Sequence, residues 1–285
     1  MTRKRVGTQQ KSMKRGTEQS MASKTRSEMA SETRPTLIMV GADKGGVGKS
    51  TLARLLLDYF ERRKLPCRAF DTEHPRGTLN RFYPQITEII NLEAVADQMK
   101  VLDTMDGAAQ RVTVLDLKAG VLSSALETFE RIGVLDAARN GQFDLGLFHV
   151  VGPSVASLEE MGEMARYTHG IQYIVARNFI NETNFFEWDD STYKKYFADL
   201  NNAQEIDIPK LNEMAYEAVD LAGATFSDFV SNRSAGDYDA GYSFVLRGYV
   251  NKWRKDVDSE LEKLAVIQGL DKSAPRGLDV SRLGS

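Results

Sequence analysis

The chain has 285 residues, 42% of them hydrophobic, and a single cysteine, so it can build a sizeable core but no internal disulfide and no cluster held by several cysteines. Its longest apolar runs are far shorter than the ~20 residues that cross a bilayer, and its polar N-terminus lacks the apolar segment of a secretory signal. These features predict a soluble, cytoplasmic protein.

The charge is distributed unevenly between the N-terminal residues and the rest of the chain. Residues 1–34 hold nine Lys or Arg and three Glu, whereas the remaining residues hold 28 basic and 37 acidic side chains. Residues 1–35 contain almost no large apolar side chain except Met, so they cannot bury enough surface to offset the entropy of ordering. We therefore predict a disordered basic tail over residues 1–35 and a single domain over residues 36–285. Such a tail would bind DNA or another polyanion without reading its sequence, and a solubilising extension is the alternative.

Regular structure is predicted to begin after Pro35. Residues 36–40 form a short apolar run that is followed by glycine, which is typical of a parallel strand covered on both faces. A glycine-rich turn comes next, and residues 51–60 then carry apolar side chains at helical spacing. A second strand is predicted over residues 66–70, and it leads into Asp71.

The later part of the chain alternates between strand-like and helix-like segments. Further strands are predicted at residues 111–115, 145–151, 171–176 and 205–208. Helices are predicted at residues 124–132, 157–167, 212–222 and 243–268, the last of them stopped by Gly269. This alternation predicts an α/β fold with a mainly parallel, doubly wound sheet flanked by helices, and a helical C-terminal part.

The strongest motif is the run Gly46-Val47-Gly48-Lys49-Ser50 between the first strand and the first helix. Glycines allow successive main-chain N–H groups to turn inward and cradle phosphates, because a Cβ would block that approach. Lys49 is expected to reach the β- and γ-phosphates, and the Ser50 hydroxyl is expected to ligate Mg²⁺. Asp43 stands where the general pattern has its first glycine.

The run Lys-Gly-Gly-Val-Gly-Lys-Ser-Thr from Lys44 to Thr51 resembles the deviant phosphate loop of the ParA/MinD ATPases, which lack that glycine. The resemblance implies a P-loop NTPase of the ParA/MinD type that binds ATP and Mg²⁺ and hydrolyses ATP. In that family the early lysine, here Lys44, reaches across an ATP-dependent homodimer to the partner's phosphates. The implied nucleotide-binding residues of the loop are Gly45, Gly46, Val47, Gly48, Lys49, Ser50 and Thr51.

A second segment of the same resemblance follows the second strand. Residues 71–77, Asp-Thr-Glu-His-Pro-Arg-Gly, are similar to the family's switch I segment. Asp71 would support the Mg²⁺ shell, and Glu73 would orient or deprotonate the attacking water. Glu73 stands where Asp is usual, which leaves the hydrolysis rate open. Lys44, Lys49 and Glu73 are thus the implied catalytic residues, and a polar turn that closes a strand is the alternative for residues 71–77.

The Mg²⁺-holding position at the end of another strand is filled by Asp116, after the apolar run 112–115. Its carboxylate would hold Mg²⁺ through water, together with Ser50 and Asp71. Gly120 matches the switch II glycine, whose N–H meets the γ-phosphate. The family commonly has prolines between these two positions, whereas this chain has Leu-Lys-Ala, and Lys118 is left without a role.

Two later positions match the family's base-recognition sites. Asn178 follows a late strand and can present both a donor and an acceptor to the adenine edge. Pro209 ends a later strand. Strand-end Asn and Pro are common in any turn, so these two assignments depend on the resemblance.

Three other features bear on partners. The histidines have no zinc-ligand spacing. An aromatic stretch, Phe185 to Trp188 and Tyr193 to Phe197, is a candidate partner surface or a satellite hydrophobic cluster. The last predicted helix carries basic residues that favour DNA, or a plain solvated helix, because acidic residues follow them and would repel anionic lipid. These basic residues are Arg247, Lys252, Arg254 and Lys255.

The function that these motifs predict is a ParA-like ATPase switch that positions or partitions DNA or other cargo of a plasmid or mobile element. Its predicted partners are a second copy of the chain, non-specific DNA and a small ATPase-stimulating protein, whereas a membrane is disfavoured. The alternative is a weakly hydrolysing, nucleotide-dependent adaptor for conjugation or plasmid stability. A metabolic enzyme or reductase with the same loop is less favoured, because the iron–sulfur reductases need cysteines that this chain lacks.

Overall fold

The computed structural model describes residues 34–105, 110–180, 190–198, 200, 202–234 and 239–272. Within this part, Pro35–Leu270 forms one compact unit. The predicted basic tail, up to residue 33, and the aromatic residues 185–188 lie outside the described residues, so the predictions made for them stay predictions.

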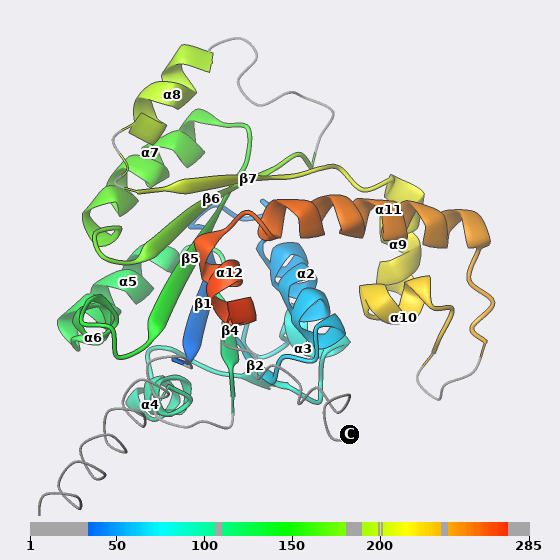
Figure 1. The fold of residues 1–285 in the computed structure, drawn as a ribbon, viewed down its shortest axis with the longest axis horizontal. Helices are drawn as coiled ribbons and strands as arrows, with labels where there is room; N and C mark the ends of the chain where they lie inside the picture. Colours follow the sequence, from blue (N-terminus) through cyan, green and yellow to red (C-terminus); the bar gives the residue numbers. More distant parts are fainter. Residues whose placement is uncertain are drawn as a thin grey trace, which may run out of the picture. The chain divides into compact units, whose positions relative to one another are not determined.

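A seven-stranded sheet forms the centre of this unit (Figure 1). Its order is β3-β2-β4-β1-β5-β6-β7, and every strand pairing in it is parallel. The strands are β1 Thr36–Gly41, β2 Cys67–Asp71, β3 Thr87–Ile89, β4 Val112–Asp116, β5 Asp144–Val151, β6 Gln172–Asn178 and β7 Gln204–Ile208. The predicted parallel α/β fold is confirmed, and β3 is an additional strand that the sequence did not predict.

Helices cover both faces of the sheet, which explains the continuous apolar runs of its strands. All six residues of β1 are buried. Along this strand Ile38 and Val40 join one core, whereas Leu37 and Met39 join the other. The period-two alternation of the strand therefore feeds two separate hydrophobic layers.

One layer packs beneath the helices α2 Lys49–Arg62, α3 Thr78–Phe82, α9 Glu213–Ala222, α10 Phe226–Val230, α11 Phe244–Leu261 and α12 Ala265–Lys272. The other packs beneath α4 Val95–Asp103, α5 Leu122–Arg131, α6 Val134–Arg139, α7 Val155–Met164 and α8 Asp190–Ala198, with a 3-10 turn at Ala165–Tyr167. No helix within the described residues has both the length and the apolar character that crossing a membrane requires.

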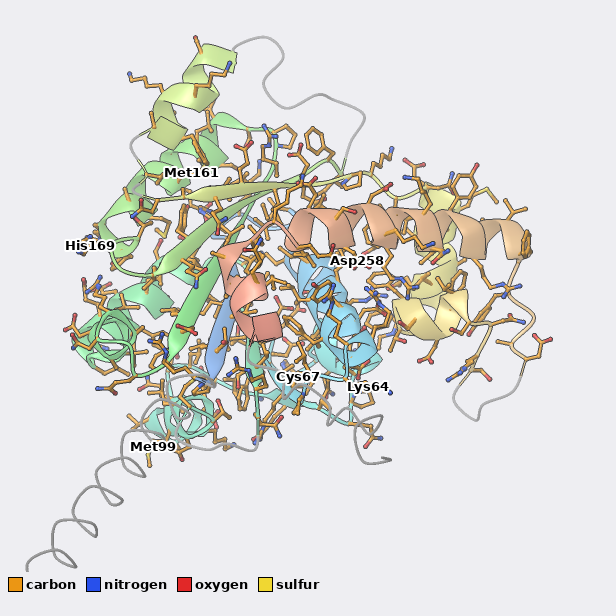
Figure 2. The ribbon with its side chains drawn as sticks, in the orientation of Figure 1. Lys64, Cys67, Met99, Met161, His169 and Asp258 are labelled. Atoms are coloured by element: carbon orange, nitrogen blue, oxygen red, sulfur yellow. The ribbon has the colours of Figure 1, made fainter. Side chains whose placement is uncertain are left out.

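The first helix leads into β2 through a tight turn. Lys64 adopts the left-handed conformation, with φ of 56°, and closes the end of α2. Pro66 follows, and β2 begins at Cys67, which is partly buried and forms no disulfide. Lys64 and Cys67 are both labelled in Figure 2.

The C-terminal part is helical, but it is not one helix. The prediction of a single helix over residues 243–268 was wrong, because α11 ends at Leu261 and α12 begins at Ala265. The side-chain oxygen Oε1 of Gln204 in β7 accepts the Ala265 N–H at 3.1 Å and helps to start the second helix. The break lets Val266 pack directly over Gly146 of β5. Gly269, the predicted stop, lies inside α12.

A buried carboxylate fastens the C-terminal helices to α2. Asp58 is fully buried and pairs with Arg62 at 2.9 Å and with Arg254 of α11 at 3.4 Å. It also accepts the Ser227 N–H of α10 at 2.7 Å. Arg254, which the sequence placed in a basic surface cluster, therefore points into the fold. A buried carboxylate needs such partners, because an unpaired one costs several kcal/mol.

Candidate functional site

The glycine-rich loop lies between β1 and α2, at the carboxyl edge of the sheet. Gly46 and Gly48 have φ of 73° and 94°, in the left-handed region that favours glycine. A Cβ on Gly48 would also lie 2.1 Å from Nδ2 of Asn178. Gly48 is the N-cap of α2 and has no side chain, so no cap side chain bonds to the N–H groups of the first helical turn. Such N–H groups are the donors that bind an anion at a helix N-terminus.

Lys49 lies inside the loop, with 8% of its surface exposed. Its Nζ donates to the main-chain oxygen of Lys44 at 3.1 Å. Burial lowers the pKa of Lys49, and four surrounding carboxylates oppose that shift, those of Asp116, Glu160, Asp43 and Glu73. The ammonium group is therefore held in a partly desolvated position where a phosphate would be its natural counter-ion.

The end of β4 supplies an incompletely satisfied carboxylate. Asp116 receives a side-chain hydrogen bond from Ser50, but its Oδ1 is buried without a hydrogen-bond partner. Burial raises the pKa of Asp116 to about 8, with Asp71 and Glu73 adding to the shift and Lys49 opposing it. Mg²⁺ typically binds to one or two carboxylates together with phosphate oxygens and water. Asp116 and Ser50 fit that pattern, because a cation there would satisfy the orphaned oxygen.

Asp71 lies beside Asp116 in the β2–β4 register. Both carboxylates, together with Lys49 and Ser50, line one charged pocket. The Asp71 carboxylate is already bound to the chain, because Oδ1 accepts the Glu73 N–H at 2.9 Å and Oδ2 accepts the Leu79 N–H at 2.7 Å. Burial raises its pKa, and these N–H groups counteract that shift. Asp71 therefore holds residues 71–77 against the start of α3, a role that the sequence did not predict.

Glu73 and Lys118 complete the wall of this charged pocket, which encloses about 320 Å³. Oε2 of Glu73 accepts a hydrogen bond from the Thr78 hydroxyl at 2.6 Å. Lys118 donates its main-chain N–H to the Thr72 hydroxyl at 2.8 Å, and so joins the segment after β4 to the segment after β2. The residue that had no role in the sequence pattern thus lies where these two segments meet.

Gly120 was expected to direct its N–H at the γ-phosphate. In this conformation the N–H donates instead to the main-chain oxygen of Asp43 at 2.8 Å. Gly120 has φ of 76°, which again favours glycine. Asp43 itself accepts hydrogen bonds from the Ser123 N–H at 3.3 Å and from the Ser123 hydroxyl. Residues 120–123 are therefore bound to the beginning of the glycine-rich loop.

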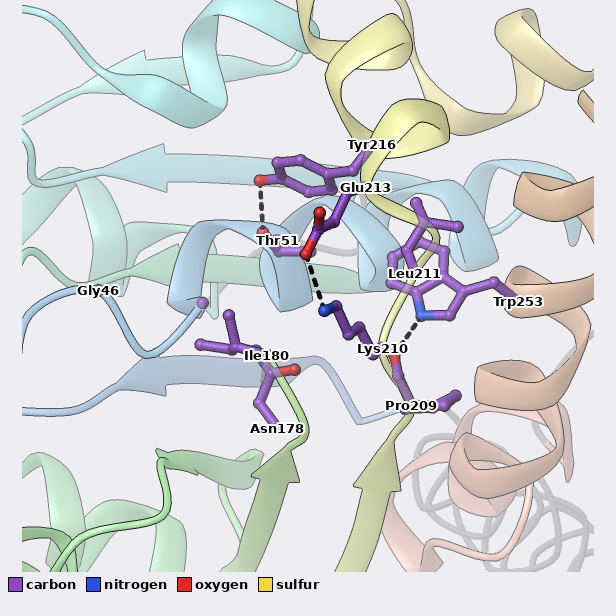
Figure 3. A pocket seen from close by; sticks show the side chains of 11 residues that line it. Gly46, Thr51, Asn178, Ile180, Pro209, Lys210, Leu211, Glu213, Tyr216 and Trp253 are labelled. Carbon is purple, nitrogen blue, oxygen red and sulfur yellow. Dashed lines mark hydrogen bonds and ion pairs between the residues drawn. The ribbon is translucent and has the colours of Figure 1, made fainter. Parts of the chain in front are cut away.

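A second pocket of about 400 Å³ adjoins the charged one, and the two share Gly46, Gly48, Thr51 and Tyr216 (Figure 3). The predicted base-contacting residues Asn178 and Pro209 both line it. The Asn178 amide, however, donates to the main-chain oxygen of Val47 at 2.8 Å, so its donor is used to hold the loop. Val47 itself is buried, with 3% of its surface exposed, and contributes its carbonyl oxygen to this bond.

Several residues of this second pocket were not predicted from the sequence. They are Ile180, Lys210, Leu211, Glu213, Tyr216 and Trp253. Figure 3 shows the Trp253 indole directed at the Pro209 oxygen, at 2.6 Å, and the Tyr216 hydroxyl at 3.1 Å from Thr51 Oγ1. Lys210 and Leu211 directly follow Pro209 and could have been included with it. Tyr216 lies on the helix that begins at Glu213 and Trp253 lies on the distant α11, and neither carries a local signal.

Lys44 and Gly45 lie at the exposed rim of the loop. The Lys44 ammonium donates to the Ser154 hydroxyl at 2.7 Å. Ser154 is the N-cap of α7 and accepts the Ser157 N–H. A Cβ on Gly45 would lie 3.7 Å from the Ala119 Cβ, in ordinary contact with switch II. Within one chain, Lys44 is therefore directed away from the charged pocket that Lys49 enters.

No family model and no curated protein matches the chain. Solved structures similar to it include the MinD cell division protein of Aquifex aeolicus, at 14% identity over 79% of this chain and 97% of that one, with a TM-score of 0.45. The septum site-determining protein MinD from Pyrococcus horikoshii OT3, complexed with Mg-ADP, is 15% identical over 79% and 96%, also with a TM-score of 0.45. An ATP complex of McdA from Cyanothece is 14% identical over 80% and 97%, with a TM-score of 0.40.

Proposed function

We propose that this chain is a Mg²⁺-dependent ATPase of the ParA/MinD type, in which ATP closes a homodimer and hydrolysis reopens it. The observation that carries the proposal is the convergence of Lys49, Ser50, Glu73 and Asp116 on one charged pocket at the carboxyl edge of the sheet. Ligands of parallel α/β folds bind at this edge. The adjoining pocket, with Trp253 and Tyr216, offers room for a flat base next to the phosphates.

Each group of the charged pocket has a chemical task in this proposal. Lys49 and the N–H groups of the loop would neutralise and orient the phosphates. Bound Mg²⁺ would supply further charge neutralisation, with Ser50 and Asp116 holding it and Asp71 supporting them. Glu73 would orient a water molecule or accept its proton. Thr78 donates to one oxygen of this carboxylate, so the other oxygen is the one directed to that task.

The proposed dimer rests on Lys44. Its ammonium is at the rim of the loop and bonds within the chain to a neutral hydroxyl, which is a weak partner for a cation. A phosphate presented by a second chain would be a stronger partner. The same lysine would then link ATP binding to dimerisation.

The proposed partners are DNA and a small ATPase-stimulating protein, and the proposed cargo belongs to a plasmid or another mobile element. Lys252 and Lys255 on α11 are exposed and support contact with DNA, whereas Arg254 is committed to Asp58. Lys252 also pairs with Asp256. The exposed surface of α11 therefore carries fewer unpaired basic groups than its sequence suggests. The N-terminal tail would supply most of the proposed DNA contact.

The test is light scattering with the purified chain, Mg²⁺ and either ATP or ADP. The monomer is expected to become a dimer with ATP and to remain a monomer with ADP. Lys44→Ala is expected to bind ATP but stay monomeric, whereas Lys49→Ala is expected to lose nucleotide binding itself. A Lys44→Ala protein that dimerises and hydrolyses ATP like wild type would overturn the role in trans.

The second candidate function is a nucleotide-dependent adaptor with weak hydrolysis. The hydrogen bond from Thr78 to Glu73 favours it, because it occupies one of the two carboxylate oxygens that could otherwise accept a proton from water. ATP turnover measured with and without DNA separates the two. An active switch should be stimulated by DNA or by its partner, whereas an adaptor should show ATP-dependent dimerisation with little turnover under either condition.

A further inference from the structure

Three buried polar side chains form a hydrogen-bonded row beneath the glycine-rich loop. They are Tyr173 of β6, His149 of β5 and Glu160 of α7. The Tyr173 hydroxyl lies 2.6 Å from His149 Nδ1, and His149 Nε2 lies 3.0 Å from Glu160 Oε1. Tyr173 and His149 have no exposed surface, and Glu160 has 8%. Neither nucleotide pocket is lined by any of the three.

Glu160, the last residue of this hydrogen-bonded row, contacts the backbone of the loop. The Glu160 carboxylate accepts the N–H groups of both Asp43 and Lys44. Lys44 is therefore held at each of its polar groups: its N–H by Glu160, its carbonyl oxygen by Lys49 Nζ, and its ammonium by Ser154. Both Glu160 and Ser154 belong to α7 or its N-cap, so this helix fixes the lysine at two points.

The same carboxylate also influences switch II through Asp43. The Asp43 oxygen accepts the Gly120 N–H at 2.8 Å, and its side chain accepts hydrogen bonds from Ser123 at the start of α5. Glu160 thus holds the Asp43–Lys44 segment, which contacts both Lys49 and Gly120. A shift of this segment would move all of them.

A buried carboxylate is costly unless its oxygens are fully bonded, so its position here needs a reason. Burial acts to raise the pKa of Glu160, but the hydrogen bond from His149 and the two loop N–H groups bring it below its ordinary value. Every polar hydrogen finds an acceptor if the Tyr173 hydroxyl donates to Nδ1 and Nε2–H donates to Glu160. Tyr173 then holds the His149 ring through Nδ1, and His149 aligns the Glu160 carboxylate under the loop through Nε2.

We propose that Glu160 is a positioning residue for the Asp43–Lys44 segment, aligned by His149, and that it sets the direction in which Lys44 leaves the loop. The inference rests on the proposed function for the role of Lys44, but the contact with the loop stands independently of it. Glu160 touches neither pocket, so it acts through the loop and not on the nucleotide.

The decisive variant is Glu160→Gln, which keeps the shape of the side chain and removes the charge and one acceptor. Amide hydrogen exchange in residues 42–48 is expected to rise roughly 10- to 100-fold, the factor that corresponds to losing hydrogen bonds to a charged group. The binding constant for ADP should stay within about threefold, because Lys49 and the glycines remain. ATP-dependent dimerisation should weaken at least tenfold, and kcat should fall with little change in KM.

The matched control is Glu159→Gln, the same substitution at the exposed neighbouring position of α7. It is expected to behave as wild type in all four measurements. Normal exchange of the loop in Glu160→Gln would overturn the proposal. Equal losses of ADP binding, dimerisation and thermal stability would also overturn it, since they would mark Glu160 as a structural residue.

Two variants at His149 keep the proposal testable even if Glu160→Gln does not fold. His149→Gln retains a donor that can reach Glu160, whereas His149→Leu removes it. The loop should exchange faster in the leucine variant than in the glutamine variant, and equal exchange in both would contradict the alignment by His149. If wild type itself does not dimerise with ATP, the proposed function fails, but the exchange measurements still decide whether Glu160 holds the loop.

Discussion

The side-chain amide of Asn178 donates to the main-chain oxygen of Val47 at 2.8 Å, so the last residue of β6 is fastened to the phosphate loop. Asn178→Ala leaves that buried oxygen without a donor, which is expected to lower the free energy of unfolding by about 1–3 kcal/mol. Asn178→Asp is expected to cost more, because it sets a carboxylate oxygen against the carbonyl. Denaturant unfolding without nucleotide measures both. Asn140→Ala, at an exposed position, is the control and should stay within about 0.5 kcal/mol of wild type.

Glu73 is the carboxylate of the charged pocket that we propose as the base for the attacking water. Glu73→Gln is expected to lower kcat for ATP by roughly 10² to 10⁴ while leaving ATP binding intact, because the amide cannot accept a proton. Thr78→Val removes the hydroxyl that bonds to this carboxylate and keeps the side-chain shape, so turnover should be at least that of wild type. Phosphate release under saturating ATP measures both variants. Wild-type turnover in Glu73→Gln would exclude this residue as the base.

Arg54 is almost completely buried between two aromatic rings. Its guanidinium carbon lies 3.4 Å from the centre of the Phe82 ring and 4.5 Å from that of Phe226, and Nε and one terminal nitrogen have no hydrogen-bond partner. Burial lowers the pKa of this side chain, which means that its charge is disfavoured where it lies. Arg54→Met should therefore be neutral or stabilising, as for other buried charges. Arg54→Ala leaves a cavity between the rings and should cost about 2–5 kcal/mol.

Thermal and denaturant unfolding of both Arg54 variants provide the test. A strongly destabilised Arg54→Met protein would show that the cation–π contacts outweigh the desolvation of the charge.

Cys67 is a partly buried thiol at the start of β2. Burial raises its pKa to about 12, with a smaller contribution from Glu61. At pH 8 the thiolate fraction is therefore small, and reaction with an aromatic disulfide reagent should be roughly 10³-fold slower in the folded protein than in denaturant. Because the unfolded thiol ionises at lower pH, the Cys67 contribution to stability should fall as pH rises above about 9. The difference in unfolding free energy between wild type and Cys67→Ala, measured from pH 8 to 10, should show that decline.

The parts of the fold that the sequence predicted well are those specified locally. The apolar run of β1, the glycines of the loop and the helical spacing of α2 are contiguous, so their pattern is sufficient. β3 has three residues, Thr87–Ile89, and pairs with β2 alone, so its sequence has too short a pattern to be recognised. The first residue of α12, Ala265, donates its N–H to Gln204, some sixty residues earlier, and no local signal marks the break between α11 and α12.

The candidate site divides in the same way. Asp71 and Asp116 end β2 and β4, and Lys49 and Ser50 begin α2 after the loop that follows β1. All four therefore lie together at one edge of the sheet, as the topology requires. Glu160, Tyr216 and Trp253 reach the loop or its pockets from helices whose sequences show only the apolar spacing of packed helices. What they contact is decided by tertiary packing, and a single sequence does not encode it in a readable pattern.

β1 lies in the middle of the strand order, so a ligand at its carboxyl end would contact strands on both sides of it. The charged pocket lies at the ends of β2 and β4 on one side of β1, and the second pocket lies at the ends of β6 and β7 on the other. A nucleotide bound as proposed would bridge both halves. Its protection of amide hydrogens should therefore form one patch around residues 71–80 and 116–119 and a second patch around residues 178–180 and 208–216, with the loop between them. A ligand that occupied phosphate contacts alone would leave the second patch exchanging freely.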